Sequence, residues 1–169
     1  MCIRDRSLDI DVLIDAKTGV GGFDLLMDYD GAALAILDVN TNNSVLYNDC
    51  GWEYFQYRYG PFGNCDGDCP SGQVRVVGLA EINNGDVHPS CFNTNAESVL
   101  FTVKFLVTND HDYNAAFVPI RFYWYDCGDN VFSNELGMEI YLSENVYDVD
   151  PNGGWVNLTP LDRLSLIHI

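Results

Sequence analysis

The sequence has 169 residues, of which 25 are acidic and 8 are Lys or Arg, so its formal net charge is −17. This balance excludes nucleic acid and anionic membrane surfaces as partners, because phosphate binding requires clustered Lys or Arg. Apolar residues make up 47% of the chain and aromatic residues 13%, which excludes a disordered protein. No apolar run approaches the roughly 20 residues that span a membrane.

The two ends of the chain are related at the DNA level. Residues 1–6 (MCIRDR) and 164–169 (LSLIHI) can be encoded by segments that are reverse complements of each other. These segments resemble the transposon end used to prepare shotgun sequencing libraries. Once such segments are set aside, we expect residues 7–163 to be a single domain cut from a longer protein. The signal peptide of that protein is then expected to be missing by truncation.

Alternating apolar and polar residues predict a series of β-strands separated by turns rich in Gly, Pro, Asn and Asp. The expected strands, in chain order, are residues 8–14, 23–29, 74–80, 99–107, 118–124 and 138–142. Residues 31–37 are the one stretch that could form a helical turn, and that turn is too short to be stable alone. Many short strands with one polar face predict an all-β antiparallel sandwich rather than a βαβ fold.

Five cysteines remain when Cys2 is set aside with the terminal segment. Each lies beside Gly, Asp, Asn, Pro or Ser, which predicts loop positions and favours disulfides in an oxidising compartment. Cys50 and Cys127 share an Asp-Cys-Gly context and are a candidate pair. The alternative is a zinc site at Cys65 and Cys69, for which a second ligand pair is lacking. The disulfide candidates are Cys50, Cys65, Cys69, Cys91 and Cys127.

Oxygen-rich loops offer ligands for a structural Ca²⁺, which prefers carboxylate and carbonyl oxygens. Residues 148–153 (DVDPNG) match the first half of a calcium loop, but Thr159 stands where the bidentate Glu belongs, so a polar turn is the alternative. The candidate calcium ligands are Asp66, Asp68, Asp126 and Asp129.

No set of residues in the sequence predicts catalysis. A catalytic triad needs a nucleophile, a base and an orienting acid, and His88 and His111 lie in turn-rich loops without such a set. Paired carboxylates cleave glycosidic bonds, but in so acidic a chain pairs arise by abundance alone. A hydrolase would have to use Glu53, Glu81 or Glu139. We expect that the domain is not an enzyme.

Aromatic side chains crowd residues 52–59, and flat exposed rings stack on sugars. In an ideal strand Trp52 and Tyr54 lie on one side and Tyr57 and Tyr59 on the other, so at least one pair is expected in the core. A second set, in residues 122–125, alternates between two faces and offers a partner surface. The candidates for a carbohydrate-binding or partner-binding surface are Trp52, Tyr54, Tyr57, Tyr59, Tyr123 and Tyr125.

Residues 22–34 (GFDLLMDYDGAAL) resemble the early strands of cohesin-type domains, in which an amphipathic strand ends in Tyr-Asp and a short turn leads to an apolar residue. Residues 8–14 and 98–108 fit the same fold, and residues 49–72 and 118–130 look like a cysteine-bearing variant of it. The resemblance implies a jelly-roll-like sandwich of about nine strands, a fold shared with several carbohydrate-binding modules.

The resemblance also implies a function. It implies a non-catalytic module of a large secreted bacterial protein, at the cell surface or outside the cell, which acts in protein–protein attachment. The implied partner is a dockerin-like protein. A carbohydrate-binding module that recognises polysaccharide through exposed aromatic residues is the alternative.

Overall fold

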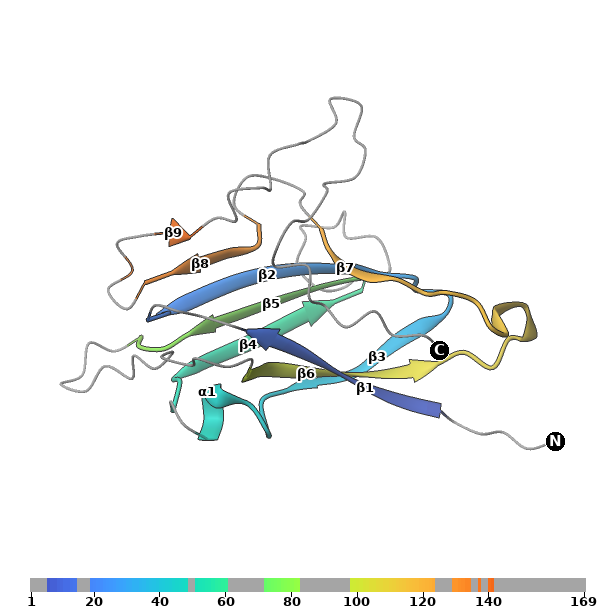
Figure 1. The fold of residues 1–169 in the computed structure, drawn as a ribbon, viewed down its shortest axis with the longest axis horizontal. Coiled ribbons are helices and arrows are strands. Elements are labelled where there is room, and N and C mark those ends of the chain that lie inside the picture. Colours follow the sequence, from blue (N-terminus) through green and yellow to red (C-terminus); the bar gives the residue numbers. More distant parts are fainter. Residues whose placement is uncertain are drawn as a thin grey trace, which may run out of the picture.

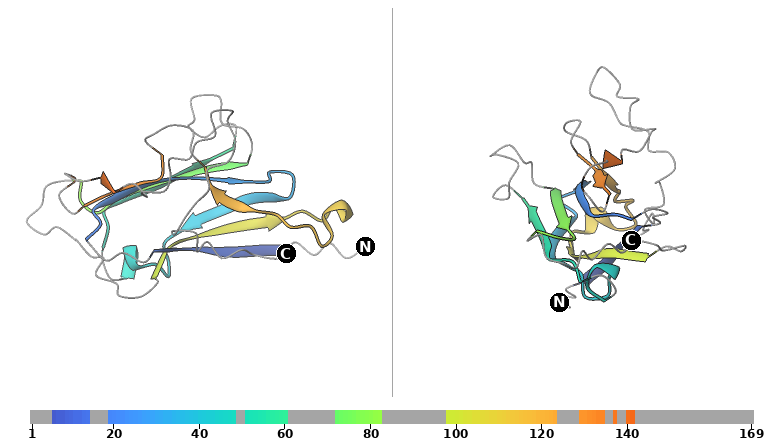
Figure 2. Two further views of the ribbon diagram at one scale, coloured as in Figure 1. Left: turned by 45° about the horizontal axis from the view of Figure 1, so that its top comes forward. Right: turned by 90° about the vertical axis from the view of Figure 1, so that its left-hand side faces the viewer.

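A computed structural model describes residues 6–14, 19–48, 51–60, 72–82, 98–123, 129–134, 137 and 140–141. Within these residues, nine strands form two antiparallel sheets packed face to face (Figures 1 and 2). The smaller sheet has the order β1-β6-β3 and consists of β1 (Arg6–Ile14), β3 (Leu34–Asn40) and β6 (Ser98–Val107). The predicted all-β antiparallel sandwich is confirmed.

The larger sheet has the order β4-β5-β2-β8-β9, and β7 also pairs with β2. Its strands are β2 (Gly22–Tyr29), β4 (Tyr54–Tyr59), β5 (Gln73–Leu79), β7 (Ile120–Phe122), β8 (Val131–Ser133) and β9 (Ile140–Tyr141). Strands β7 and β8 share one side of β2: β7 pairs with its end at Met27–Tyr29, and β8 with its start at Gly22–Asp24.

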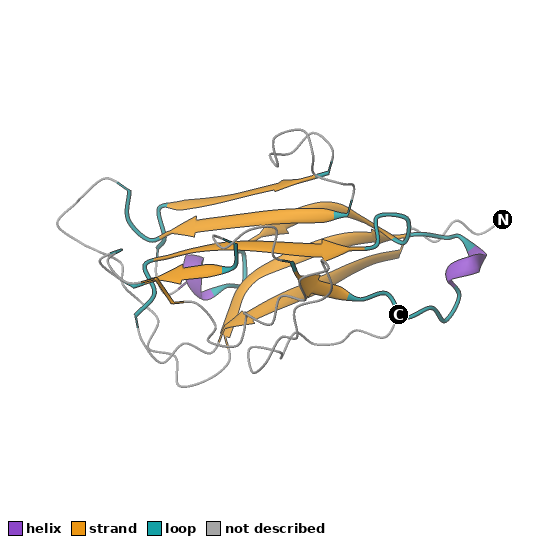
Figure 3. Cartoon of the chain, turned by 90° about the horizontal axis from the view of Figure 1, so that it is seen from above, coloured by secondary structure: helices purple, strands orange, loops and turns teal. Residues whose placement is uncertain are grey.

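Two short helical segments lie at opposite ends of the sandwich (Figure 3). They are α1 (Val45–Asn48) and the 3-10 helix η1 (His111–Tyr113). The carboxylate of Asp110 caps η1 by accepting the backbone N–H of Asp112 at 3.0 Å. Among the described residues, no helix is long and apolar enough to cross a membrane.

The core lies between the sheets and follows from the alternation of the strands. On β2 every second side chain, from Phe23 to Tyr29, is buried against the smaller sheet. The ring of Phe23 stacks on Phe101 of β6 with centroids 6.1 Å apart, and Tyr29 meets Phe105 edge-on at 5.2 Å. Burial of such rings is the main source of stability. The same alternation leaves the intervening aspartates of β2 on the outer face of the larger sheet.

Residues 31–37, which could have made a short helical turn, form a turn over residues 31–33, after which strand β3 begins at Leu34 and pairs with β6. The turn ends where the backbone N–H groups of Ala33 and Leu34 both reach the carbonyl oxygen of Asp30, at 3.1 and 2.9 Å. From there, every residue of β3 except Leu37, where the register shifts, has a partner on β6, which an isolated helical turn does not provide.

The predicted strand at residues 118–124 is shorter than expected, and covers only β7. Strand β7 ends at Phe122, although the N–H of Tyr123 still donates to the carbonyl oxygen of Leu26, and β8 pairs with β2 only at Gly22–Asp24. All five cysteines considered above, and residues 1–5 and 164–169, lie outside the described residues. The disulfides, the zinc alternative and the assignment of the terminal segments therefore stay predictions.

Candidate binding surface

The outer face of the larger sheet carries an ordered set of polar side chains. On β2, the residues between those that face the core are Asp24, Leu26 and Asp28, of which the two aspartates are part-exposed and Leu26 is buried. Register places Asp24 beside Val77 of β5, and Val77 beside Gln56 of β4. The next row of the sheet contains Arg75 and Arg58. We call the outer face of β2, β4 and β5 the outer surface.

Arg75 is the centre of this surface. Its Nε donates to Asp24 Oδ1 at 2.8 Å, and its Nη2 forms an ion pair with Asp129. Only 1% of the Asp129 side chain is exposed, whereas 30% of the Arg75 side chain is exposed. A buried carboxylate is tolerated when it is paired and hydrogen-bonded. The two carboxylates thus fix the position of the Arg75 guanidinium on the outer surface.

Asn130 fills the gap that β7 and β8 leave along β2. Its Oδ1 accepts the backbone N–H of Leu26 at 2.8 Å, and its Nδ2 donates to the carbonyl oxygen of Tyr123 at 2.7 Å. The N–H of Tyr123 in turn donates to the carbonyl oxygen of Leu26 at 2.9 Å. The amide side chain therefore replaces a missing piece of strand backbone. It holds Asp129, the preceding residue, in reach of Arg75.

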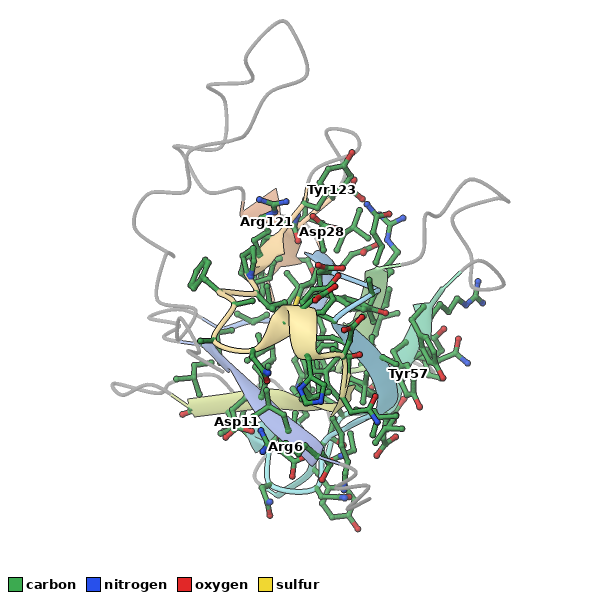
Figure 4. The ribbon with its side chains drawn as sticks, turned by 90° about the vertical axis from the view of Figure 1, so that its right-hand side faces the viewer. Arg6, Asp11, Asp28, Tyr57, Arg121 and Tyr123 are labelled. Carbon is green, nitrogen blue, oxygen red and sulfur yellow. The ribbon has the colours of Figure 1, made fainter. Side chains whose placement is uncertain are left out.

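A second ion pair lies at the other end of β2. Nη2 and Nε of Arg121 on β7 lie 3.1 and 3.2 Å from Asp28 Oδ2. These two residues are direct cross-strand partners. Figure 4 shows Arg121 and Asp28 together, with Tyr123 beside them and far from Arg6 and Asp11 of the smaller sheet. Opposite charges in this position stabilise strand pairing modestly.

The outer surface contains an open hollow of about 290 Å³ beside Arg75. The Tyr54 hydroxyl donates to Gln56 Oε1 at 2.9 Å at its edge. The residues that line the hollow are Asp24, Tyr54, Gln56, Arg58, Arg75 and Val77. The hollow thus combines a polar rim with one aliphatic side chain, a composition that suits contact with a protein side chain.

Positive charge is concentrated on this side of the molecule. Of the five Lys and Arg side chains within the described residues, three lie on the larger sheet, namely Arg58, Arg75 and Arg121. The outer face of the smaller sheet carries Asp9 and Asp11 together with Lys104, the register partner of Asp9, and the Asp11 carboxylate accepts the Thr102 hydroxyl at 2.7 Å. The two faces of the sandwich therefore present different charges to a partner.

The aromatic residues singled out in the sequence do not form one platform. Trp52 precedes β4 and packs against Phe23 in the core, with ring centroids 5.6 Å apart, so the expectation that Trp52 and Tyr54 share a face is wrong. The reason is that the strand begins only at Tyr54. Tyr54 lines the hollow on the outer surface.

Tyr57 and Tyr59 do share a face, the one toward the core. Their rings stack with centroids 6.1 Å apart and an interplanar angle of 12°. The Tyr57 hydroxyl donates to Asp38 Oδ1 at 3.2 Å (Figure 4 shows Tyr57 on the flank of the sandwich), and burial and then the Asp38 charge raise the pKa of Tyr57. Tyr59, at the strand end, stays 40% exposed.

The remaining predicted site residues are only partly described. Tyr123 is half-buried beside Asn130, and Tyr125 lies outside the described residues. Of the candidate calcium ligands, Asp129 pairs with Arg75, and Asp66, Asp68 and Asp126 lie outside the described residues. No group of three or more metal-binding side chains occurs among the residues the structure describes. The calcium site stays a prediction.

The sequence interpretation missed Asp24, Gln56, Arg58, Arg75 and Asn130. A signal for four of them was present, since each occupies a polar position of an alternating strand, two residues from another polar or amphipathic residue. Asn130 gave no such signal, because its role depends on the gap between two strands that a single sequence does not reveal.

No family model and no curated protein sequence matches this chain. Solved structures do. The cohesin of the Coh-OlpA–Doc918 complex from Clostridium thermocellum superposes with a TM-score of 0.56 at 15% identity, and the match covers 81% of this chain and 82% of that one.

Two further matches are similar. The sixth cohesin of Acetivibrio cellulolyticus scaffoldin B, solved with the Cel5 dockerin, has a TM-score of 0.52 at 12% identity over 77% of both chains. CaCohA2 of Clostridium acetobutylicum has a TM-score of 0.50 at 14% identity, over 77% of this chain and 71% of that one. At these identities the likeness concerns the fold. This chain has the fold of a cohesin domain.

Proposed function

We propose that this chain is a non-catalytic attachment module that binds a dockerin-like protein through its outer surface. The similar cohesins were solved in complexes with dockerins, which supports a protein partner of that kind. The observation that carries the proposal is the ordered network of Arg75 with Asp24 and Asp129. A surface whose charged groups are already held in place loses little side-chain entropy when a partner binds.

The size of the surface supports a protein partner rather than a small molecule. Three long strands, β2, β4 and β5, present their polar side chains on one side. A stable protein interface needs roughly 800 Å² per partner, and flat sheet faces supply such areas. The hollow is open and lined by charged and polar side chains, unlike the enclosed apolar pockets that hold small ligands.

A secreted location fits this proposal. Cysteines at this density, each beside a turn-forming residue in the sequence, are typical of oxidising compartments, and an acidic chain poor in Lys favours neither nucleic acid nor anionic lipid. We infer that the module belongs to a larger extracellular or cell-surface protein and that its partner is another extracellular protein.

A panel of calcium-loaded dockerin domains from bacterial multi-domain proteins tests the proposal. Biolayer interferometry with the immobilised chain should give saturable binding for at least one dockerin, with a 1:1 stoichiometry. The dockerin that binds should lose its binding once calcium removal has unfolded it. This control excludes nonspecific adhesion to the acidic chain. The absence of binding across the panel would count against a dockerin partner.

Polysaccharide binding is the second candidate, and the exposed Tyr59 stacked on Tyr57 favours it. Affinity electrophoresis in gels that contain plant polysaccharides measures it directly. Retardation of the wild-type chain that disappears in Tyr59→Ala would support a carbohydrate module and contradict attachment through the outer surface. Because Trp52 packs in the core, Tyr59→Ala is a cleaner test than a substitution of Trp52.

A further inference from the structure

Two arginines stand directly opposite each other across β4 and β5. Arg58 is the register partner of Arg75, and both lie on the outer surface. Like charges in directly opposed positions destabilise a sheet. The whole chain has only 8 Lys and Arg residues, so the pair does not result from an abundance of basic residues. Local conflicts of this kind concentrate at functional sites, where stability is sacrificed for binding.

The two arginines are neutralised unequally. Arg75 is held by the carboxylates of Asp24 and Asp129. Arg58 is exposed, and within the described part of the chain no carboxylate forms an ion pair with it. The Arg58 charge is therefore uncompensated at the rim of the hollow. This is a local positive site on a protein whose net charge is −17.

The hollow also contains hydrogen-bond donors other than the Arg58 guanidinium. Gln56 uses its Oε1 to accept the Tyr54 hydroxyl at 2.9 Å, which directs the amide without using its Nε2 hydrogens. Gln56 and Arg58 lie on the same side of β4, two residues apart, and both line the hollow. Guanidinium and amide N–H groups that line one hollow match the acceptor oxygens of a carboxylate.

We propose that this hollow receives the carboxylate of an Asp or Glu side chain from the protein partner, with Arg58 as its principal contact. The proposal rests on the proposed function, and specifies the partner's chemistry at one point of the same surface. Charge complementarity carries it: both carboxylates at the site are held by Arg75, which leaves the Arg58 guanidinium available to a partner's carboxylate, while the chain as a whole is acidic. The site therefore recognises an acidic side chain at one position on the partner's surface. It does not require the partner to be acidic overall.

NMR titration of the full chain with a small probe tests the site without a known partner. The probe is N-acetyl-glutamate N-methylamide, and the isosteric glutamine compound is its neutral control. The glutamate compound should give saturable shifts of the Arg58 and Arg75 Nε–Hε signals, and the glutamine compound should bind at least about fivefold more weakly. Equal responses to the two compounds would overturn the proposal.

Two variants localise the effect. Arg58→Gln should weaken the glutamate compound by about tenfold, because it removes the charged hydrogen-bond donor. Lys104→Gln changes a cation on the smaller sheet and should leave binding unchanged. If Arg58→Gln bound the glutamate compound as tightly as the wild type, the compound would bind elsewhere on the chain, and the proposal would be contradicted. Glucuronate that binds more tightly than the glutamate compound would favour an acidic polysaccharide instead and contradict the proposal.

The outcomes separate this site from the proposed function. If a dockerin binds the chain but the glutamate compound does not bind at Arg58, the carboxylate site is contradicted and the dockerin partner is not. Saturable binding of the glutamate compound with no dockerin bound contradicts the dockerin partner and leaves the chemistry of the hollow standing. Where a dockerin does bind, Arg58→Glu should abolish its binding, and an acidic-to-Arg change in the dockerin should restore it. If no acidic-to-Arg change in the dockerin restored its binding to Arg58→Glu, a carboxylate contact at Arg58 would be contradicted.

Discussion

Replacement of Asn130 by Ala should destabilise the domain more than its position in a short connection suggests. The substitution leaves the backbone N–H of Leu26 without its acceptor, in a residue that is 2% exposed. An unsatisfied buried donor costs about 1–3 kcal/mol. Loss of the hydrogen bond to the Tyr123 carbonyl adds about 1 kcal/mol.

Backbone conformation adds a third contribution at the same position. Asn130 has φ 57°, in the left-handed region that Asn tolerates and Ala does not favour. An alanine there costs about a further 1 kcal/mol. The contributions together give roughly 3–5 kcal/mol, a large part of the 5–15 kcal/mol that stabilises an ordinary domain.

Urea unfolding followed by tryptophan fluorescence measures this loss, and hydrogen exchange at the Leu26 amide locates it. Asn130→Gly removes the same hydrogen bonds without backbone strain, so it should be about 1 kcal/mol more stable than Asn130→Ala. Asn114→Ala, at an exposed asparagine whose side-chain amide lies 3.1 Å from His111 Nδ1, should change stability by less than about 0.5 kcal/mol. A loss below about 1 kcal/mol for Asn130→Ala would refute the bridging role.

Three further changes test the structure by their effects on stability. Arg75→Met removes the ion pair that Arg75 makes with the buried Asp129 carboxylate, which should cost about 3–5 kcal/mol in urea unfolding. The added change Asp129→Leu should recover most of that loss, and no recovery would argue against the ion pair. Gly72→Ala should cost about 2–4 kcal/mol, because Gly72 has φ +107° and an added Cβ would collide with the carbonyl oxygen of Tyr29. An unchanged urea midpoint would contradict this conformation of the backbone at Gly72. Burial, and secondarily the Tyr59 charge, raise the pKa of Tyr29 from 10.0 to about 12. The folded state therefore holds this proton more tightly than the unfolded state, so the stability contribution is complete below pH 10 and is lost as pH rises to about 12. Near-ultraviolet absorbance titration should show one tyrosine fewer ionising late in Tyr29→Phe than in the wild type, and identical curves would contradict the assignment.

The strands were predictable from the sequence where one face of a strand is buried and the other is exposed to solvent. Residues 23–29 and 99–107 show this alternation over most of their length, and the structure forms a strand over each, with one further residue at the start. In residues 31–37 alanine and leucine allow a short helical turn locally, whereas pairing with β6 decides the conformation from Leu34 onward. A local pattern contains no information about the strand that will lie beside it.

The candidate site was predictable in its residue types but not in its grouping. The polar faces of residues 23–29 and 74–80 are visible in the sequence, so exposed Asp24 and Arg75 follow from alternation alone. Their contact depends on the register of β2 against β5, which is 51 positions away in the chain. The pairing of Arg75 with Asp129 depends further on Asn130 and the gap between β7 and β8.

The central claim is that the outer surface, rather than the opposite face, binds the protein partner. A matched pair of variants tests it, because Val77 and Leu106 are both half-buried aliphatic residues on the outward side of inner strands, one in each sheet. For a dockerin identified in the panel, Val77→Glu should weaken the Kd by at least about tenfold, and Leu106→Glu should leave it within about twofold. Equal Kd values for the two variants, or a loss confined to Leu106→Glu, would contradict the account.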